Sequence, residues 1–120
     1  MRVMGIDPGS NCTGFGIVEE IKGDLHAVHW SSVRSTPKHS FPERLKRIYD
    51  ELVLAMKKFQ PDVVAVEDLF YATNVKTVIK LAQTRGVILL AAINCGIQVG
   101  AARTAGFISR QREALAVLPP

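Results

Sequence analysis

The chain has 120 residues, of which 48% are hydrophobic and 22% charged, so we expect a single globular domain with a buried core. Its net charge of +4 is compatible with a polyanionic partner. Cys12 and Cys95 form no CxxC pair, which argues against a zinc site or a disulfide framework and favours reduced thiols in a cytoplasmic protein. We recognise no signal peptide, and the longest apolar run, residues 87–93, is too short to span a bilayer, so no membrane contact is expected.

The first third of the chain predicts three strands joined by short connections. Residues 2–7 are a short apolar run that ends at Asp7, directly before a Pro-Gly turn. Residues 13–19 and 25–33 are typical of a second and a third strand, and the hairpin signal Lys-Gly-Asp at 22–24 separates them. Connections this short predict an antiparallel meander.

An amphipathic helix is predicted next. Ser40 and Glu43 have the spacing of a capping box, in which Pro42 is tolerated in the first turn. Apolar residues then recur with helical spacing along one stripe: Leu45, Ile48, Tyr49, Leu52, Val53 and Met56. The basic residues of this segment lie off the stripe, which favours a solvated face: Arg44, Lys46, Arg47, Lys57 and Lys58.

A fourth strand and a second helix follow. Residues 62–67 hold an unbroken apolar core, which suits a strand buried on both faces, and they end in a second acid, Glu67. Asn74 is a suitable cap for a helix that runs to about Cys95. Residues 87–93 of that helix are apolar all round, so they are expected to be buried, either in the core or against another subunit.

The character of the chain changes after its predicted fifth strand, residues 97–99. Beyond residue 99 the sequence contains three arginines, no lysine, no aspartate and one acid, Glu113. A short helix is predicted at residues 109–118. The sequence therefore divides into a core, residues 1–99, and a divergent C-terminal segment, residues 100–120.

Two acids follow two predicted strands, and this pattern indicates a site. Asp7 and Glu67 each stand at the carboxyl end of a strand, where mixed sheets build their sites. If the two strands are parallel neighbours, the carboxylates meet, and their repulsion requires a cation or a shared proton. Oxygen ligands of this kind suit Mg²⁺ or Mn²⁺, and such a site serves two-metal phosphodiester cleavage. The alternative interpretation is that Asp7 caps a turn and that Glu67, which is followed by Asp68, belongs to a helix or a loop.

Three glycines near Asp7 allow a second interpretation. Gly9, Gly14 and Gly16 permit close approach of the backbone or a bulge in a strand, but they fit neither GxGxxG spacing nor a Walker A loop. The stretch also resembles the first phosphate loop of the sugar-kinase, actin and chaperone ATPase group. An ASKHA-type phosphate-binding fragment is therefore an alternative.

Four blocks together resemble one known family, the RuvC family of Holliday junction resolvases (crossover junction endodeoxyribonucleases). The blocks are "GIDPGSNCTGFGIVEE" from residue 5, "ERLKRIYDEL" from 43, "FQPDVVAVEDLF" from 59 and "NVKTVIKLAQTRGVILLAAIN" from 74. The resemblance covers about residues 1–99. It implies an RNase H-like α/β fold, in which a five-stranded mixed sheet carries helices on both sides.

The resemblance also implies an activity and partners. Members of this family are homodimers that cut four-way DNA junctions symmetrically in recombination and repair, using Mg²⁺, for which Mn²⁺ can substitute. Their partners are junction DNA and the RuvA and RuvB branch-migration proteins. The roles of catalytic acid and metal ligand fall on Asp7 and Glu67. Phe70 occupies the place of an aromatic residue near the DNA, and the dimer-forming helix contains Leu81 and Val87.

The C-terminal segment departs from the family. The family has two further acids in an Asp-Ala-Ala-Asp-like run on a C-terminal helix, and lysines beyond the fifth strand that face DNA. Residues 100–120 contain neither, as a frameshifted or replaced end would produce. We therefore expect the 120-residue chain to be impaired in catalysis. The second hypothesis is a non-catalytic remnant that dimerises or binds branched DNA.

Overall fold

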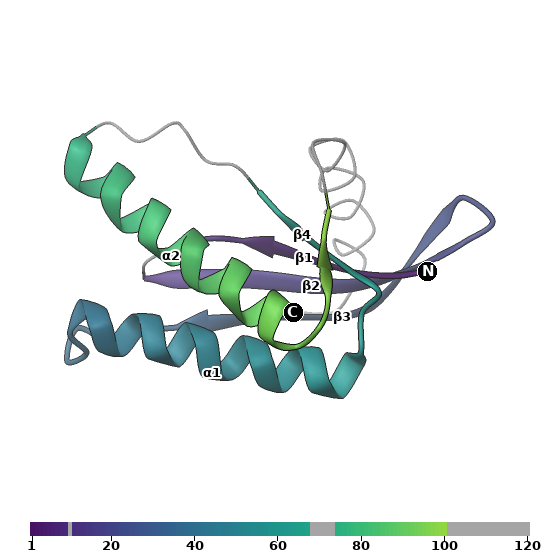
Figure 1. Cartoon of the computed structure of the whole chain (residues 1–120), viewed down its shortest axis with the longest axis horizontal. Helices are drawn as coiled ribbons and strands as arrows, with labels where there is room; N and C mark the ends of the chain where they lie inside the picture. Colours follow the sequence, from purple (N-terminus) through teal and green to yellow (C-terminus); the bar gives the residue numbers. More distant parts are fainter. Residues whose placement is uncertain (10, 68–73, 101–120) are drawn as a thin grey trace.

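The computed structural model describes residues 1–9, 11–67 and 74–100 (Figure 1). In chain order the elements are β1 (Arg2–Asp7), β2 (Cys12–Ile21), β3 (Asp24–Arg34), α1 (Phe41–Phe59), β4 (Val63–Val66), α2 (Val75–Asn94) and β5 (Gln98–Val99). Each strand and helix predicted within the described residues is present. The helix predicted at residues 109–118 lies outside them, as does Phe70.

The five strands form one mixed sheet in the order β3-β2-β1-β4-β5. β1, β2 and β3 pair antiparallel, which confirms the meander predicted from their short connections. β4 pairs parallel with β1, and β5 pairs parallel with β4. The N-terminal strand is therefore central, and its carboxyl end lies beside the carboxyl end of β4.

β2 and β3 form a long hairpin that is closed by a tight turn at Lys22 and Gly23. Lys22 and Gly23 both have positive φ, 52° and 86°, and the strands pair continuously up to this turn, so both extend past the predicted ends. A bulge interrupts the register between Ile17 and Val18. On β3, Trp30 lies opposite Gly16 of β2 and is 50% exposed.

Both helices begin at the predicted caps. The Ser40 hydroxyl accepts a hydrogen bond from the Glu43 backbone N–H at 3.3 Å, and the Asn74 amide oxygen accepts one from the Thr77 N–H at 2.9 Å. α1 ends as Gln60 adopts a left-handed conformation with φ 48°.

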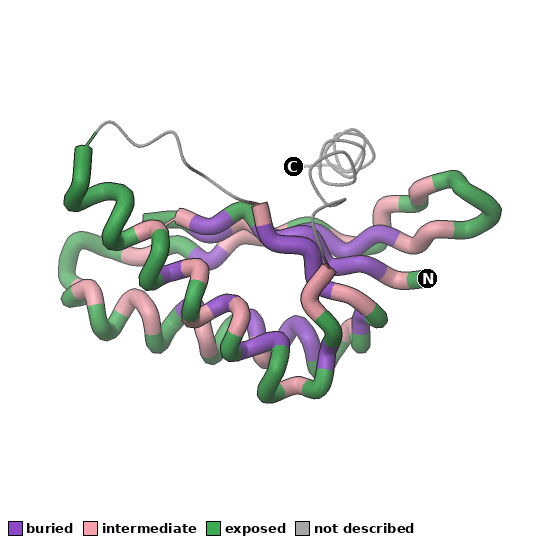
Figure 2. Tube along the Cα trace, turned by 45° about the horizontal axis from the view of Figure 1, so that its top comes forward, coloured by how far each residue is buried: buried purple, intermediate pink, exposed green. Residues whose placement is uncertain are grey.

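α1 and α2 cover the same face of the sheet and build the main core there. Alternate strand residues point into it, among them Met4, Ile6, Phe15, Ile17, Val64 and Val66. The helices contribute Ile48, Leu52, Ala55, Met56, Ile88, Ala91 and Ala92. Figure 2 shows this buried centre and the exposed first turns of α2, of which residues 74–80 are all exposed. Within residues 1–9, 11–67 and 74–100, neither helix is long and apolar enough to cross a membrane.

Arg2 ties the start of β1 to three neighbouring segments. Its backbone N–H donates to the Asp62 carboxylate at 2.8 Å, and the Asp62 N–H donates to the Arg2 carbonyl at 2.8 Å. Its guanidinium donates to Glu19 on β2 at 3.1 Å and to the Phe59 carbonyl at the end of α1 at 2.8 Å. These bonds hold β1 and β4 in register at the start of both strands, at the end of β1 that lies away from Asp7.

Candidate active site

Asp7 is the last residue of β1 and lies on the sheet face opposite the two helices. Met4 and Ile6 point into the core beneath the helices, so the alternation along the strand turns Asp7 to the other face. Asp7 is exposed, and its partner on β2 is Gly14. A Cβ at Gly14 would meet nothing within 4 Å, so the absence of a side chain there leaves open space beside Asp7.

Glu67 directly follows β4 and continues its parallel register with β1. Ile6 is paired with Val66, and the Glu67 backbone N–H donates a 3.0 Å hydrogen bond to the Ile6 carbonyl. Val66 points into the helix-covered core, so Glu67 turns to the same face as Asp7. The structure therefore brings Asp7 and Glu67 to one edge of the sheet, on adjacent strands with a spacing of about 4.8 Å.

The turn after Asp7 is closed by a contact that sequence reasoning missed. The buried Thr13 hydroxyl donates to the Gly9 carbonyl at 2.8 Å and accepts from the Gly9 N–H at 3.3 Å. The turn also needs glycine at position 9, because a Cβ there would stand 2.2 Å from the Cys12 carbonyl oxygen. The only sign of this contact in the sequence is that Thr13 stands four residues after Gly9, which follows Pro8.

The two acids provide oxygen donors, which are the ligands that Mg²⁺ prefers. Asp7 is exposed and Glu67 half-buried, so carboxylate oxygens are presented at the surface of the sheet edge. No group of three or more His, Cys, Asp or Glu side chains suited to a metal ion occurs among the described residues. The described part of the site is thus an acid pair, which can serve one divalent ion together with water and a phosphate ligand.

The remaining predicted site residues lie elsewhere. Phe70 is outside the described residues. Leu81 and Val87 are half-buried on α2, and Val87 packs against the core of its own chain. The apolar residues of α2 that face solvent are instead Val75, Val78, Ile79, Leu90 and Ile93, which we call the α2 stripe. Ile88, Ala91 and Ala92 are thus buried in the core as predicted, while Leu90 and Ile93 face solvent in the single chain, so for them burial against another subunit stays a prediction.

The model of the family crossover junction endodeoxyribonuclease RuvC matches residues 3–109. RuvC of Syntrophomonas wolfei is 43% identical over 99 residues, which cover 82% of this chain and 58% of that protein. RuvC of Fusobacterium nucleatum is 48% identical over 91 residues, which cover 76% of this chain and 48% of that protein. The chain thus spans about half of the length of these relatives.

One solved structure with a similar fold is that of T. thermophilus RuvC in complex with Holliday junction substrate. Its TM-score is 0.75 at 31% identity, and the match covers 82% of this chain and 62% of that one. The yeast mitochondrial Holliday junction resolvase matches with a TM-score of 0.64 at 14% identity, which shows a shared fold. These neighbours confirm the predicted RNase H-like mixed sheet. Of the helices expected on both sides of it, the described residues hold two, α1 and α2, and both cover the same face.

Proposed function

Because the chain belongs to the RuvC family of crossover junction endodeoxyribonucleases, we propose that it carries the acid pair of a nuclease that cuts four-way DNA junctions. The observation that carries this proposal is the parallel register of β1 and β4, extended by the hydrogen bond from Glu67 to Ile6. In this arrangement Asp7 and Glu67 are the catalytic acids. The alternative of an ASKHA-type phosphate loop lacks comparable support, since the family match extends over residues 3–109.

Asp7 and Glu67 are proposed to hold Mg²⁺, which Mn²⁺ can replace. A pair of carboxylates agrees with the usual binding of Mg²⁺ through one or two carboxylates, water and substrate phosphate. When bound, the ion would supply a nucleophile at neutral pH and stabilise charge on the departing oxygen. The open space at Gly14 beside Asp7 leaves room for a phosphate to approach the pair.

A homodimer is proposed through α2. Symmetric cutting of a junction needs two acid pairs, and a second copy supplies the second one. The α2 stripe gives this idea its physical basis, because its apolar side chains face solvent along one helix. Leu81 lies on the same helix and is half-buried, so it is placed at the margin of this surface.

The proposed macromolecular partner is junction DNA, and the proposed location is the cytoplasm, where RuvA and RuvB act as branch-migration partners. The net charge of +4 agrees with a polyanionic partner. The domain division stays a proposal as well: residues 1–99 form the nuclease core, and residues 100–120 form a segment of different character.

The chain of residues 1–120 is proposed to cut poorly by itself. Its one acid beyond residue 99 is Glu113, whereas two metal ions need several oxygen ligands each. The second candidate function follows from this observation: a dimer that binds branched DNA without cutting it.

The test uses a synthetic four-way junction and a linear duplex of the same sequence. We expect tighter binding of the junction, and Mg²⁺-dependent symmetric incision once a family-like C-terminal helix with two further acids is added to the chain. Equal affinity for the duplex and the junction would contradict the proposed function. Junction binding without incision by the extended protein would favour the non-cutting alternative.

A further inference from the structure

We propose that Arg34, Arg44 and Arg47 form a phosphate-binding band that positions a DNA arm beside Asp7 and Glu67. The three arginines lie at the end of the sheet where these two acids stand. Arg34 ends β3, while Arg44 and Arg47 lie in the first two turns of α1. This inference rests on the proposed function, because it takes DNA as the partner. It adds a positioning surface to that function.

The band is held by neutral oxygen atoms. Arg44 Nη1 donates to the Asn11 side-chain oxygen at 2.6 Å, and Arg47 Nε donates to the Arg34 carbonyl at 2.9 Å. None of the three arginines forms an ion pair with an acid among the described residues, where the ion pairs are Met1–Glu19, Arg2–Glu19 and Lys46–Asp50. The guanidinium groups of Arg44 and Arg47 are therefore oriented, and the positive charges of the band are not neutralised by an ion pair with an acid of the described residues.

Two polar atoms of this region lack a partner within the described part of the chain. Arg44 Nε and the Ser35 hydroxyl are both buried without a hydrogen bond. Both residues contact Asn11, since the Ser35 backbone N–H donates to the Asn11 carbonyl at 3.0 Å. Buried polar groups normally have partners. Because these two atoms are covered, a phosphate reaches them only after the side chains around them move, so the binding of DNA rests on the exposed parts of the arginines.

A further cation extends the band from α1 to α2. The Arg44 guanidinium lies 5.6 Å from the centre of the Phe41 ring, and Lys80 Nζ on α2 lies 5.9 Å from the same centre. One aromatic ring thus keeps two positive side chains close together. A cluster of positive side chains is the electrostatic footprint of a nucleic-acid surface.

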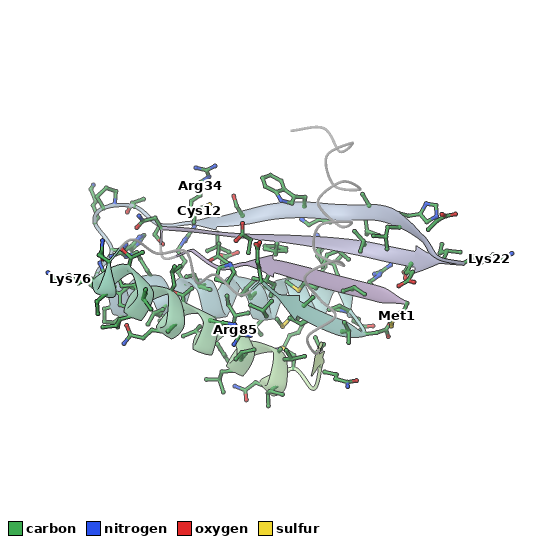
Figure 3. All side chains as sticks on the ribbon, turned by 90° about the horizontal axis from the view of Figure 1, so that it is seen from above. Met1, Cys12, Lys22, Arg34, Lys76 and Arg85 are labelled. Carbon is green, nitrogen blue, oxygen red and sulfur yellow. The ribbon has the colours of Figure 1, made fainter. Side chains whose placement is uncertain are left out.

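The sheet register places Arg34 within reach of the acid pair. Asp7 is paired with Gly14, and Cys12, two residues before Gly14, is paired with Arg34. Two strand spacings and two residues along the strand correspond to about 12 Å between the Cα atoms of Asp7 and Arg34. Figure 3 shows Arg34 next to Cys12, with its side chain extending away from the ribbon. On one DNA strand the phosphates follow one another every ~3.4 Å along the helix axis. A single DNA strand can therefore contact both Arg34 and the acid pair within a few nucleotides.

A groove beside Arg47 marks where the phosphate-binding band ends on α1. It has a volume of about 300 Å³ and is lined by His39, Glu43, Lys46, Arg47, Asp50 and Glu51. Three carboxylates in this groove disfavour phosphate, so Arg47 contributes to the band by its hydrogen bond to the Arg34 carbonyl, and the DNA arm is directed to Arg34 and Arg44 rather than along the outer side of α1.

The test measures binding of the full chain to a four-way junction across a range of salt concentrations. Arg34→Gln and Arg44→Gln should each lower the slope of log K against log salt by about 0.9, and the double variant by about twice that. Arg44→Lys should keep most of the slope, because it keeps the charge. Lys57→Gln, at the other end of α1, is the matched control and should leave the slope unchanged. Circular dichroism checks that each variant is folded.

The outcomes separate this inference from the proposed function. If the wild-type chain shows no preference for the junction, the proposed function fails. If it binds the junction but folded Arg34→Gln and Arg44→Gln keep the wild-type slope, the phosphate-binding band is wrong while the function stands. Phosphate-ethylation interference that maps contacts within a few nucleotides of the junction centre, and loses them in the double variant, would support the band.

Discussion

The backbone N–H of Glu67 donates a 3.0 Å hydrogen bond to the carbonyl of Ile6, the residue directly before Asp7. This bond extends the parallel ladder of β1 and β4 by one step beyond the last paired residues, Ile6 and Val66. The relative position of the two acids is therefore set by main-chain atoms. Substitution of either carboxylate should therefore leave the sheet intact, so that a loss of activity can be attributed to the missing carboxylate and not to a change in the fold.

Asp7→Asn should abolish junction incision while retaining junction binding. The amide keeps the size of the side chain but removes the charge that the proposed Mg²⁺ requires, so we expect a loss of more than about 100-fold in incision rate. Incision should be measured in the chain extended with the two further acids, and binding by gel shift. Glu51→Gln, an exposed acid on α1, is the matched control. Unchanged incision by Asp7→Asn would show that the chemistry lies elsewhere.

Gly9→Ala should destabilise the fold by about 1–3 kcal/mol, because its Cβ would stand 2.2 Å from a backbone oxygen that cannot move aside easily. Gly14→Ala is the matched control, because a Cβ at that position meets nothing within 4 Å, and its effect should stay within about 0.5 kcal/mol. Urea unfolding of both variants measures the difference. Equal stability of the two variants would mean that the turn after Asp7 can relax around an added methyl group.

Ile79→Glu and Leu81→Glu should shift the protein from dimer to monomer. Ile79 is 52% exposed in the α2 stripe, so a charge there should not disturb the chain's own core but should oppose burial against a second copy. Leu54→Glu is the control, because Leu54 is 63% exposed but lies on α1. Sedimentation velocity at micromolar concentration gives the mass. A wild-type protein that sediments as a monomer would contradict the proposed dimer.

Residues 1–120 should show little or no Mg²⁺-dependent incision of a four-way junction. Glu113 is the one acid of residues 100–120, and in the sequence Arg110 and Arg112 stand within three residues of it. Replacement of this segment by a family-like C-terminal helix with two acids should restore incision. A time course on a labelled junction compares the two proteins. Robust symmetric cutting by residues 1–120 would overturn the prediction.

Much of the fold was predictable because its signals are local. The Lys-Gly-Asp turn, the Ser40 and Asn74 caps and the acids that end two apolar runs are each contained in a few neighbouring residues. They suffice for the meander, for both helices and for the strand ends at which Asp7 and Glu67 stand.

The features that the sequence did not reveal depend on distant contacts. Arg44 was assigned to a solvated face, but it is bound to Asn11, 33 residues away. The anchoring of Arg2 by Asp62 spans 60 residues. The side of α2 that faces solvent was also not predictable, because Val87 and Leu90 are equally apolar and only the position of the helix over the sheet separates them. Periodicity identifies an element but does not identify its neighbours.

Trp30 gives the protein an optical probe on the face that carries the acid pair. It is the one tryptophan of the chain, half exposed on β3 and paired with Gly16, which in turn is paired with Gly5 of β1. The emission of the unlabelled protein therefore arises from a single indole whose partner on the adjacent strand is a glycine, with a second glycine on the strand beyond. A nucleobase that stacks on this ring would quench the emission, and burial of the ring would shift it to shorter wavelength, so one titration distinguishes the two modes of contact.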